Sequence, residues 1–191
     1  MKKWLVFIGI LLFISNVFAQ KEETVFDYSG LKLTGVWGGP TFVFSGIGDK
    51  NTCFRGGFGG LEFNKSISIA YAAYWLEDKI ELSQLPGQKV DMRYNGLLLG
   101  YSLKPVKVLH PKFMLLVASG KLEVENEKRD CLFVLQPGAG VEINVFKWWH
   151  IDILGGYRIV KGTDISALSD SDLSAPFGEI KLRFGISWGW F

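Results

Sequence analysis

The sequence is poor in the side chains on which most catalytic proteins depend. Its 191 residues include only two histidines and two cysteines. Neither His110 nor His150 has a serine nearby at strand spacing, so the sequence does not indicate a hydroxyl nucleophile beside a general base. We therefore expect no catalytic residues, no enzymatic activity and no bound cofactor.

Patterns of metal ligands are scarce as well. Asp164, Asp170 and Asp172 gather in one segment and offer oxygen ligands of the kind that Ca²⁺ prefers. Their spacing differs from that of an EF-hand, and segments rich in serine and aspartate are usually solvated. The sequence therefore predicts no metal site.

The chain also lacks an excess of either charge once its first residues are set aside. Lys2 and Lys3 precede an apolar run over residues 4–14 and a zone of small residues that ends at Ala19. This order is typical of a cleaved secretory signal peptide, which we predict over residues 1–19. Removal of Lys2 and Lys3 reduces the 21 basic residues to 19, equal to the 19 acidic ones. We therefore expect no nucleic-acid partner.

No later segment approaches the length of a membrane-spanning helix, and no internal repeat or low-complexity tract is evident. Glycine and turn residues instead divide the chain into eight segments that resemble strands. Their approximate ranges are 32–45, 54–64, 66–76, 91–103, 113–122, 132–145, 149–161 and 177–190. Most reach the roughly 9–11 residues that a tilted transmembrane strand requires.

The connections between these segments largely alternate in length. Longer polar connections, over residues 46–53, 77–90, 123–131 and 162–176, follow the odd-numbered segments, and short ones lie near residues 64–65 and 146–148. An outer-membrane barrel has short periplasmic turns and longer outer loops. By this arrangement His110 lies in a periplasmic turn, and His150 lies at the membrane interface.

The C-terminal segment alternates strictly. One parity, from Ile180 to Trp190, is apolar and aromatic, and the other carries Glu179, Lys181 and Arg183. A barrel strand needs this pattern, because one face meets lipid and the other meets the lumen, with aromatic residues at the interface. The predicted aromatic girdle consists of Trp148, Trp149, Trp188 and Trp190. Phe191 is out of phase with it.

Segments 66–76, 132–145 and 149–161 alternate in the same way, whereas residues 97–99 and 113–117 are apolar on both faces. The predicted lumen charge network consists of Glu142, Asp152, Arg158, Glu179, Lys181 and Arg183, with Glu62 and Arg93 as further candidates. Buried charges must be paired, so we expect Asp152 and Arg158 to pair with charges of the last segment. An eight-stranded barrel can be filled by side chains, and the network is expected to plug it. A narrow ion-conducting path through the network is an alternative.

Several stretches resemble the small eight-stranded outer-membrane β-barrel proteins of Gram-negative bacteria, of the OmpA-like and OmpX-like kind. They are Gly59–Ser66 (GGLEFNKS), Gly96–Pro105 (GLLLGYSLKP), Gln136–Trp149 (QPGAGVEINVFKWW), Gly155–Gly162 (GGYRIVKG) and the terminal LRFGISWGWF. Each is a strand beside a tight turn. The resemblance implies an all-β, eight-stranded antiparallel up-and-down transmembrane β-barrel over residues 20–191.

Two questions stay open. Cys53 and Cys131 permit a disulfide in an exported chain, but their strands lie opposite each other in an eight-stranded ring. A soluble exported barrel, similar to a lipocalin and binding an apolar ligand, would also alternate, with apolar residues inside.

We predict a monomeric, porin-like protein of the cell outer membrane with a structural or surface-interaction role. Its expected partners are outer-membrane lipid and lipopolysaccharide, and the barrel-assembly machinery through the C-terminal strand. The outer loops, with glutamates such as Glu123 and Glu125, are the expected interaction surface.

Overall fold

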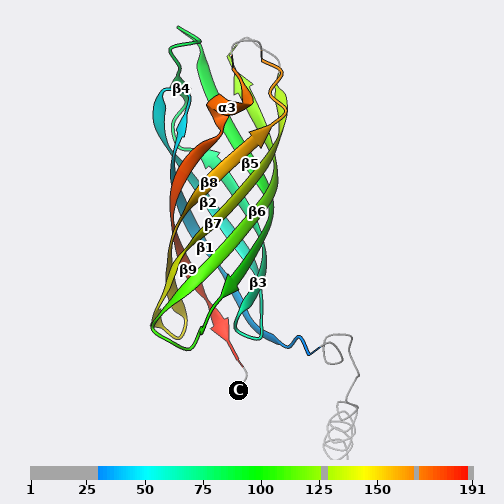
Figure 1. Cartoon of the computed structure of the whole chain (residues 1–191), viewed down its shortest axis with the longest axis vertical. Helices are drawn as coiled ribbons and strands as arrows, with labels where there is room; N and C mark the ends of the chain where they lie inside the picture. The colour runs from blue at the N-terminus through cyan, green and yellow to red at the C-terminus, as the bar shows by residue number, and fades with distance from the viewer. Residues whose placement is uncertain (1–29, 126–128, 166–167, 189–191) are drawn as a thin grey trace, which may run out of the picture. The chain divides into compact units, whose positions relative to one another are not determined.

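The computed structural model describes residues 30–125, 129–165 and 168–188. From Leu33 onward the chain forms a closed antiparallel β-barrel (Figure 1). Its wall consists of β1 (Leu33–Ile47), β2 (Lys50–Phe63), β3 (Ile67–Leu76), β5 (Lys89–Ser102), β6 (Leu109–Val124), β7 (Asp130–Phe146), β8 (Trp149–Lys161) and β9 (Ala175–Ser187). A two-residue strand, β4 (Ile80–Glu81), and a one-turn helix, α3 (Asp170–Leu173), belong to the connections. The predicted fold class is confirmed.

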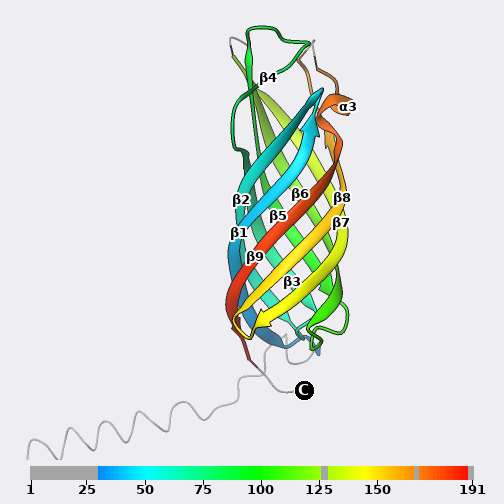
Figure 2. The ribbon, with the colours of Figure 1, turned by 90° about the vertical axis from the view of Figure 1, so that its left-hand side faces the viewer.

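Each wall strand pairs with the next wall strand in the sequence, and the pairing of β1 with β9 closes the ring. β1 pairs with β9, so that Phe42 lies opposite Ile180, and β3 pairs with β5, so that Ala72 lies opposite Gly96. The strands run obliquely around the barrel, as Figure 2 shows for β1, β9, β8 and β7. A closed ring leaves no strand edge unpaired. The predicted signal peptide, Trp190 and Phe191 lie outside the described residues.

The two ends of the barrel differ in their connections (Figure 1). One end holds the turns β2–β3, β5–β6 and β7–β8, and we call it the turn end. The other end holds the connections that contain β4 and α3, and we call it the loop end. Among the described residues, no helix is long and apolar enough to cross a bilayer.

The first connection is shorter than predicted. Instead of an outer loop over residues 46–53, β1 and β2 stay paired as far as Ile47 and Lys50, which leaves Gly48 and Asp49 as the turn. Gly48 has a φ of +54°, a left-handed conformation that glycine adopts without steric cost. Two-residue hairpin turns favour such residues, and the polar stretch therefore extends the hairpin instead of forming a loop.

The outward face of the wall is apolar. Exposed large hydrophobic side chains include Val36, Phe44, Ile69, Tyr71, Leu97, Phe113, Phe133, Ile153, Tyr157 and Phe184. A soluble lipocalin-like barrel has polar residues on this face, so that alternative does not fit the structure. An apolar outer surface is instead what a strand wall in contact with lipid requires.

The interior has two layers of different chemistry. Near the loop end it is apolar, with Phe54, Tyr94, Leu116, Leu122, Val134 and Val160 buried, and Leu82, Leu85, Leu168 and Leu173 of the connections packed over them. Near the turn end it is charged. This layering explains the strands that are apolar on both faces, because Met92, Leu98, Met114 and Leu116 fill the interior while their neighbours face outward.

Candidate functional site

The charged layer is organised around Glu142 of β7. Its Oε2 accepts from Lys112 Nζ at 2.9 Å and lies 3.3 Å from His110 Nε2. Its Oε1 lies 2.8 Å from His150 Nδ1 and also pairs with Arg183. All of these groups except His150, which is partly exposed, are buried. One carboxylate therefore joins four basic side chains from β6, β8 and β9.

Two further carboxylates complete the layer. Asp152 Oδ2 lies 2.9 Å from Lys112 Nζ, and its Oδ1 lies 4.0 Å from Arg183 Nη1. Glu62 Oε2 accepts from Arg183 Nη2 at 3.4 Å. The guanidinium of Arg183 also lies over the ring of Trp37, 5.0 Å from its centroid. The cations are thus shared between acids on different strands, which links distant parts of the wall.

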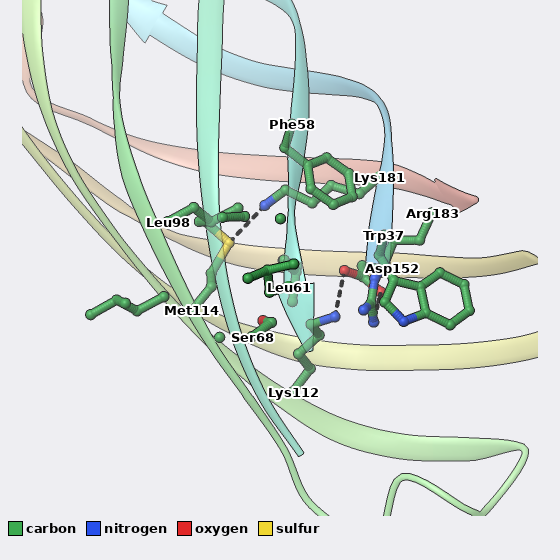
Figure 3. Close-up of a pocket in the computed structure, with 15 residues that line it drawn as sticks. Trp37, Phe58, Leu61, Ser68, Leu98, Lys112, Met114, Asp152, Lys181 and Arg183 are labelled. Carbon is green, nitrogen blue, oxygen red and sulfur yellow. Dashed lines mark hydrogen bonds and ion pairs between the residues drawn. The ribbon is translucent and has the colours of Figure 1, made fainter. Parts of the chain in front are cut away.

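A second, smaller cluster lies nearer the middle of the barrel. Glu179 Oε1 lies 3.0 Å from Lys181 Nζ and accepts from Thr41 Oγ1 at 2.7 Å and Tyr74 Oη at 3.0 Å. Lys181 Nζ also lies 3.1 Å from the sulfur of Met114, as Figure 3 shows. Hydrogen bonds and an ion pair therefore compensate the burial of both charges.

Arg158 lies apart from both clusters, in the apolar layer. Its Nε donates to the carbonyl of Leu173 at 3.1 Å and its Nη2 donates to the carbonyl of Gly46 at 2.6 Å. Its guanidinium lies 4.7 Å from the ring centroid of Phe54. The expected pairing of Arg158 with Glu179 is therefore wrong: instead of an acid, two backbone carbonyls near the loop end accept hydrogen bonds from this cation.

A cavity of about 20 Å³ lies between Lys112, Met114, Asp152 and Lys181 (Figure 3), which is room for roughly one water molecule. A larger vestibule of about 670 Å³ opens at the turn end, beside Glu62, Glu142 and His150. Among the described residues, four buried carboxylates and four buried Lys and Arg side chains face the interior, so these charges balance without the histidines.

The structure brings Glu142, Asp152, Glu179, Lys181 and Arg183 into the interior, with Arg158 in the other layer. Of the two further candidates, Glu62 faces inward, whereas Arg93 is exposed on the outward face and pairs with Glu123. The sequence reasoning missed Lys112. Its parity with Met114 and Leu116, which are buried on the same strand, was the available signal.

The positions expected for the histidines also change. His110 is not in a turn: β6 begins at Leu109, and the His110 ring points inward to Glu142. His150 is not only an interfacial residue, because its Nδ1 reaches Glu142 and its ring lies tilted against that of Trp37, with centroids 4.3 Å apart. Both rings belong to the charged layer. Ser102 donates its hydroxyl proton to Glu142 at 2.9 Å and not to a histidine, so these side chains do not form a nucleophile–base pair.

The predicted girdle residues Trp148 and Trp149 stack with Phe146 and Phe184 at the turn end, and Trp148 and Trp188 are exposed. The possible disulfide is not formed, and both cysteines are free thiols. Cys53 is on β2 and Cys131 is on β7, strands that are not neighbours in the sheet. Among the described residues, no cluster of three or more histidine, cysteine or acidic side chains could hold a metal ion.

The connections at the loop end interlock through aspartates. Ser83 Oγ donates to Asp49 at 2.7 Å, Thr163 N donates to Asp170 at 3.1 Å, and Ser169 Oγ donates to Asp172 at 2.7 Å. These hydrogen bonds stabilise the carboxylate form and hold the pKa of each aspartate below its usual value.

A closed barrel of eight long strands, with an apolar exterior and paired charges inside, is the architecture of a small outer-membrane barrel. Comparison with solved structures gives the same class. Neisserial surface protein A matches with a TM-score of 0.57 and 12% identity, over 83% of this chain and 99% of that one. The N-terminal β-barrel domain of OprF from Pseudomonas aeruginosa matches with a TM-score of 0.56 and 12% identity, over 81% and 98%.

The attachment invasion locus protein Ail of Yersinia pestis, solved with the heparin analogue sucrose octasulfate, matches with a TM-score of 0.50 and 18% identity, over 81% and 97%. No protein-family model and no curated relative matches the sequence. At these identities the likeness establishes a shared fold. The predicted resemblance to small eight-stranded outer-membrane barrels is thereby confirmed at the level of the fold.

Proposed function

We propose that the protein is an integral outer-membrane barrel with a plugged lumen, and that it acts through its surface and not by catalysis. The observation that carries this proposal is the contrast between its two faces. Side chains such as Phe44, Tyr71 and Phe133 are exposed on the outward face, whereas Glu142 and Arg183 are buried inside. This distribution suits a wall surrounded by hydrocarbon.

The plug consists of two barriers in series. In the charged layer, ion pairs around Glu142 and Asp152 occupy the lumen, and the cavity beside them has a volume of about 20 Å³. In the apolar layer, Leu82 and Leu173 of the connections are buried over the mouth. An ion that enters from the vestibule would have to separate buried ion pairs and then cross an apolar region, and both steps are costly.

The proposal has further parts, which concern export, assembly and partners. A signal peptide over residues 1–19 directs export, and the C-terminal strand β9 is recognised by the barrel-assembly machinery. The folded protein is a monomer that contacts outer-membrane lipid and lipopolysaccharide. The loop end, which contains β4 and α3, forms the surface available to extracellular partners.

Membrane fractionation with heat-modifiable gel migration tests this proposal. We expect the full chain in the outer-membrane fraction, with a band that shifts on boiling because the folded barrel resists detergent. Recovery from the soluble periplasm without a shift would contradict the membrane assignment.

Planar-bilayer recordings test the plug separately. The wild-type protein is expected to produce no steady conductance, since an ion would have to pass both barriers. Regular, voltage-independent openings from inserted wild-type barrels would contradict the plug while leaving the membrane assignment intact.

A further inference from the structure

A groove of about 680 Å³ lies on the outward face of the wall near the loop end, across β3, β5 and β6. Its outward-facing lining includes Ala73, Trp75, Arg93, Asn95, Ser119 and Lys121. The interior network and the aromatic girdle do not include any of these residues. The groove is therefore a separate feature of the surface.

Two rows of side chains shape the groove. In the first row, small residues lie side by side on neighbouring strands, because Ala73 is opposite Asn95 and Asn95 is opposite Ser119. In the next row toward the loop end, Trp75 is opposite Arg93 and Arg93 is opposite Lys121. The short side chains leave a hollow beneath a row of long ones.

The cationic row is electrostatically unfavourable on its own. Arg93 and Lys121 are directly cross-strand, and like charges in this position destabilise a sheet. Arg93 pairs with Glu123, but Glu123 is shared with Arg129, whose Nε lies 3.1 Å away. Lys121 has no ion pair with any residue that the structure describes. An anion placed between Arg93 and Lys121 would remove the repulsion and satisfy both.

The groove also lies at a boundary between polar and apolar surface. On β5, the outward residues change from Arg93 and Asn95 to the exposed leucines Leu97 and Leu99. On β6, they change from Lys121 and Ser119 to Val117 and Leu115 on the same face. An occupant of the groove would therefore have its anionic part beside the cations and its apolar part along the leucines.

We propose that this groove binds a phosphorylated, multiply acylated lipid of the outer leaflet, with a headgroup phosphate between Arg93 and Lys121 and an acyl chain along Leu97 and Val117. Arginine and lysine form strong charge-assisted hydrogen bonds with phosphate. The aromatic ring of Trp75 suits the same interfacial depth. The inference rests on the proposed outer-membrane location, and it adds a defined lipid site to the general contact with the membrane.

Native mass spectrometry of the folded barrel in detergent tests this site, with lipid A bearing two phosphates as the probe. The double substitution Arg93→Gln and Lys121→Gln is expected to weaken binding about tenfold or more, because both charge-assisted contacts are lost. The matched control is Lys50→Gln with Lys161→Gln, which removes two exposed cations from other strands of the same end. Unchanged binding in the control and weaker binding in the groove variant support the site.

A second comparison changes the lipid instead of the protein, and so does not depend on how the variants fold. Wild-type protein is expected to bind lipid A without phosphates about tenfold less tightly. Free inorganic phosphate is expected to compete weakly, because it lacks the acyl chains. Equal loss of binding in the groove and control variants, or equal binding of phosphorylated and dephosphorylated lipid, would overturn the inference. A heat-modifiable barrel in the membrane fraction would show that the proposed function survives that failure.

Discussion

Glu142 on β7 and Arg183 on β9 form a buried ion pair that crosses β8, the strand lying between theirs. The pair lies on the inner face of the wall and is distinct from the hydrogen bonds between neighbouring strands. Arg183 also reaches Glu62 on β2. The charged layer therefore connects strands on different sides of the ring, and its loss should affect the stability of the whole barrel.

The substitution Glu142→Gln is expected to lower the free energy of unfolding by about 3–5 kcal/mol, because Lys112 and Arg183 would remain buried without their shared carboxylate. Urea unfolding in lipid vesicles measures this change. Glu125→Gln, which removes an exposed carboxylate near the loop end, is the control and should change stability by less than about 0.5 kcal/mol. Equal effects of the two substitutions would mean that the network does not stabilise the barrel.

The substitution Arg158→Met is expected to loosen the connection that carries α3. Methionine fills similar space but cannot donate to the carbonyls of Leu173 and Gly46. Hydrogen exchange of residues 168–174 should become faster, while exchange in the strands near the turn end stays the same. Ile153→Met on the same strand, where the side chain is exposed on the outward face, is the control. Unchanged exchange in Arg158→Met would exclude the anchoring role.

The aspartates of the loop end predict that the stability of the connection containing α3 depends on pH. Their pKa values are lowered in the folded protein, chiefly by hydrogen bonds from Thr163 to Asp170 and from Ser169 to Asp172. A carboxyl group whose pKa is lowered by folding stabilises the folded state at pH values above its ordinary pKa of 3.8. This stabilisation is lost as the pH falls through the pKa of the folded state. Hydrogen exchange of this connection, corrected for intrinsic rates, should therefore accelerate below about pH 3.8.

In Asp172→Asn the same connection is expected to exchange faster already at neutral pH, with a smaller acid response. Asp164→Asn in the same connection is the control, because the Asp164 side chain is exposed and accepts no hydrogen bond from the described residues. An identical acid response in all three proteins would show that these hydrogen bonds do not control the connection.

The loss of stability caused by a charge on the outward face should depend on its depth in the membrane. Leu99→Arg places a cation among exposed apolar residues of β5 and is expected to destabilise the barrel by about 2–4 kcal/mol in vesicles. Asn95→Arg on the same strand and face lies at the polar boundary, where the expected cost is about 0–1 kcal/mol. Urea unfolding of both variants gives the comparison. Equal costs would place both residues at the same depth and contradict the proposed boundary.

The alternation of single strands allowed much of the fold to be predicted. On β9, the charged residues and the apolar residues alternate. The structure places Glu179, Lys181 and Arg183 on the inward face, and Ile180 and Phe184 on the outward face. The alternation predicts the faces of β9 correctly because the two faces lie in different environments. On β1 and β2 the many glycines give no such contrast, and the inward position of Trp37 and the turn at Gly48 could not be derived.

The candidate site was harder to predict, because it depends on contacts between strands. The predicted segment begins at residue 113, which places His110 and Lys112 in the preceding turn, whereas β6 begins at Leu109. Pro111 is in fact an exposed residue of β6 opposite Val141. Arg158 shares the inward parity of Asp152 but lies nearer the loop end, among apolar neighbours. Parity gives the face of a residue, and only the register of several strands gives its partners.

The position of β9 in the chain has a consequence for biogenesis. This strand is the last to be added, and it forms hydrogen bonds with both β1 and β8. It also supplies the buried cations Lys181 and Arg183. Before it is added, Glu142 and Asp152 share Lys112, Glu142 also has the two histidines, and Glu62 lacks its partner Arg183. A chain that stops before β9 therefore has both an open seam and uncompensated negative charge. Completion of the chain is thus coupled to closure of the barrel, and truncated products should be easily distinguished from finished ones by the cell's proteases.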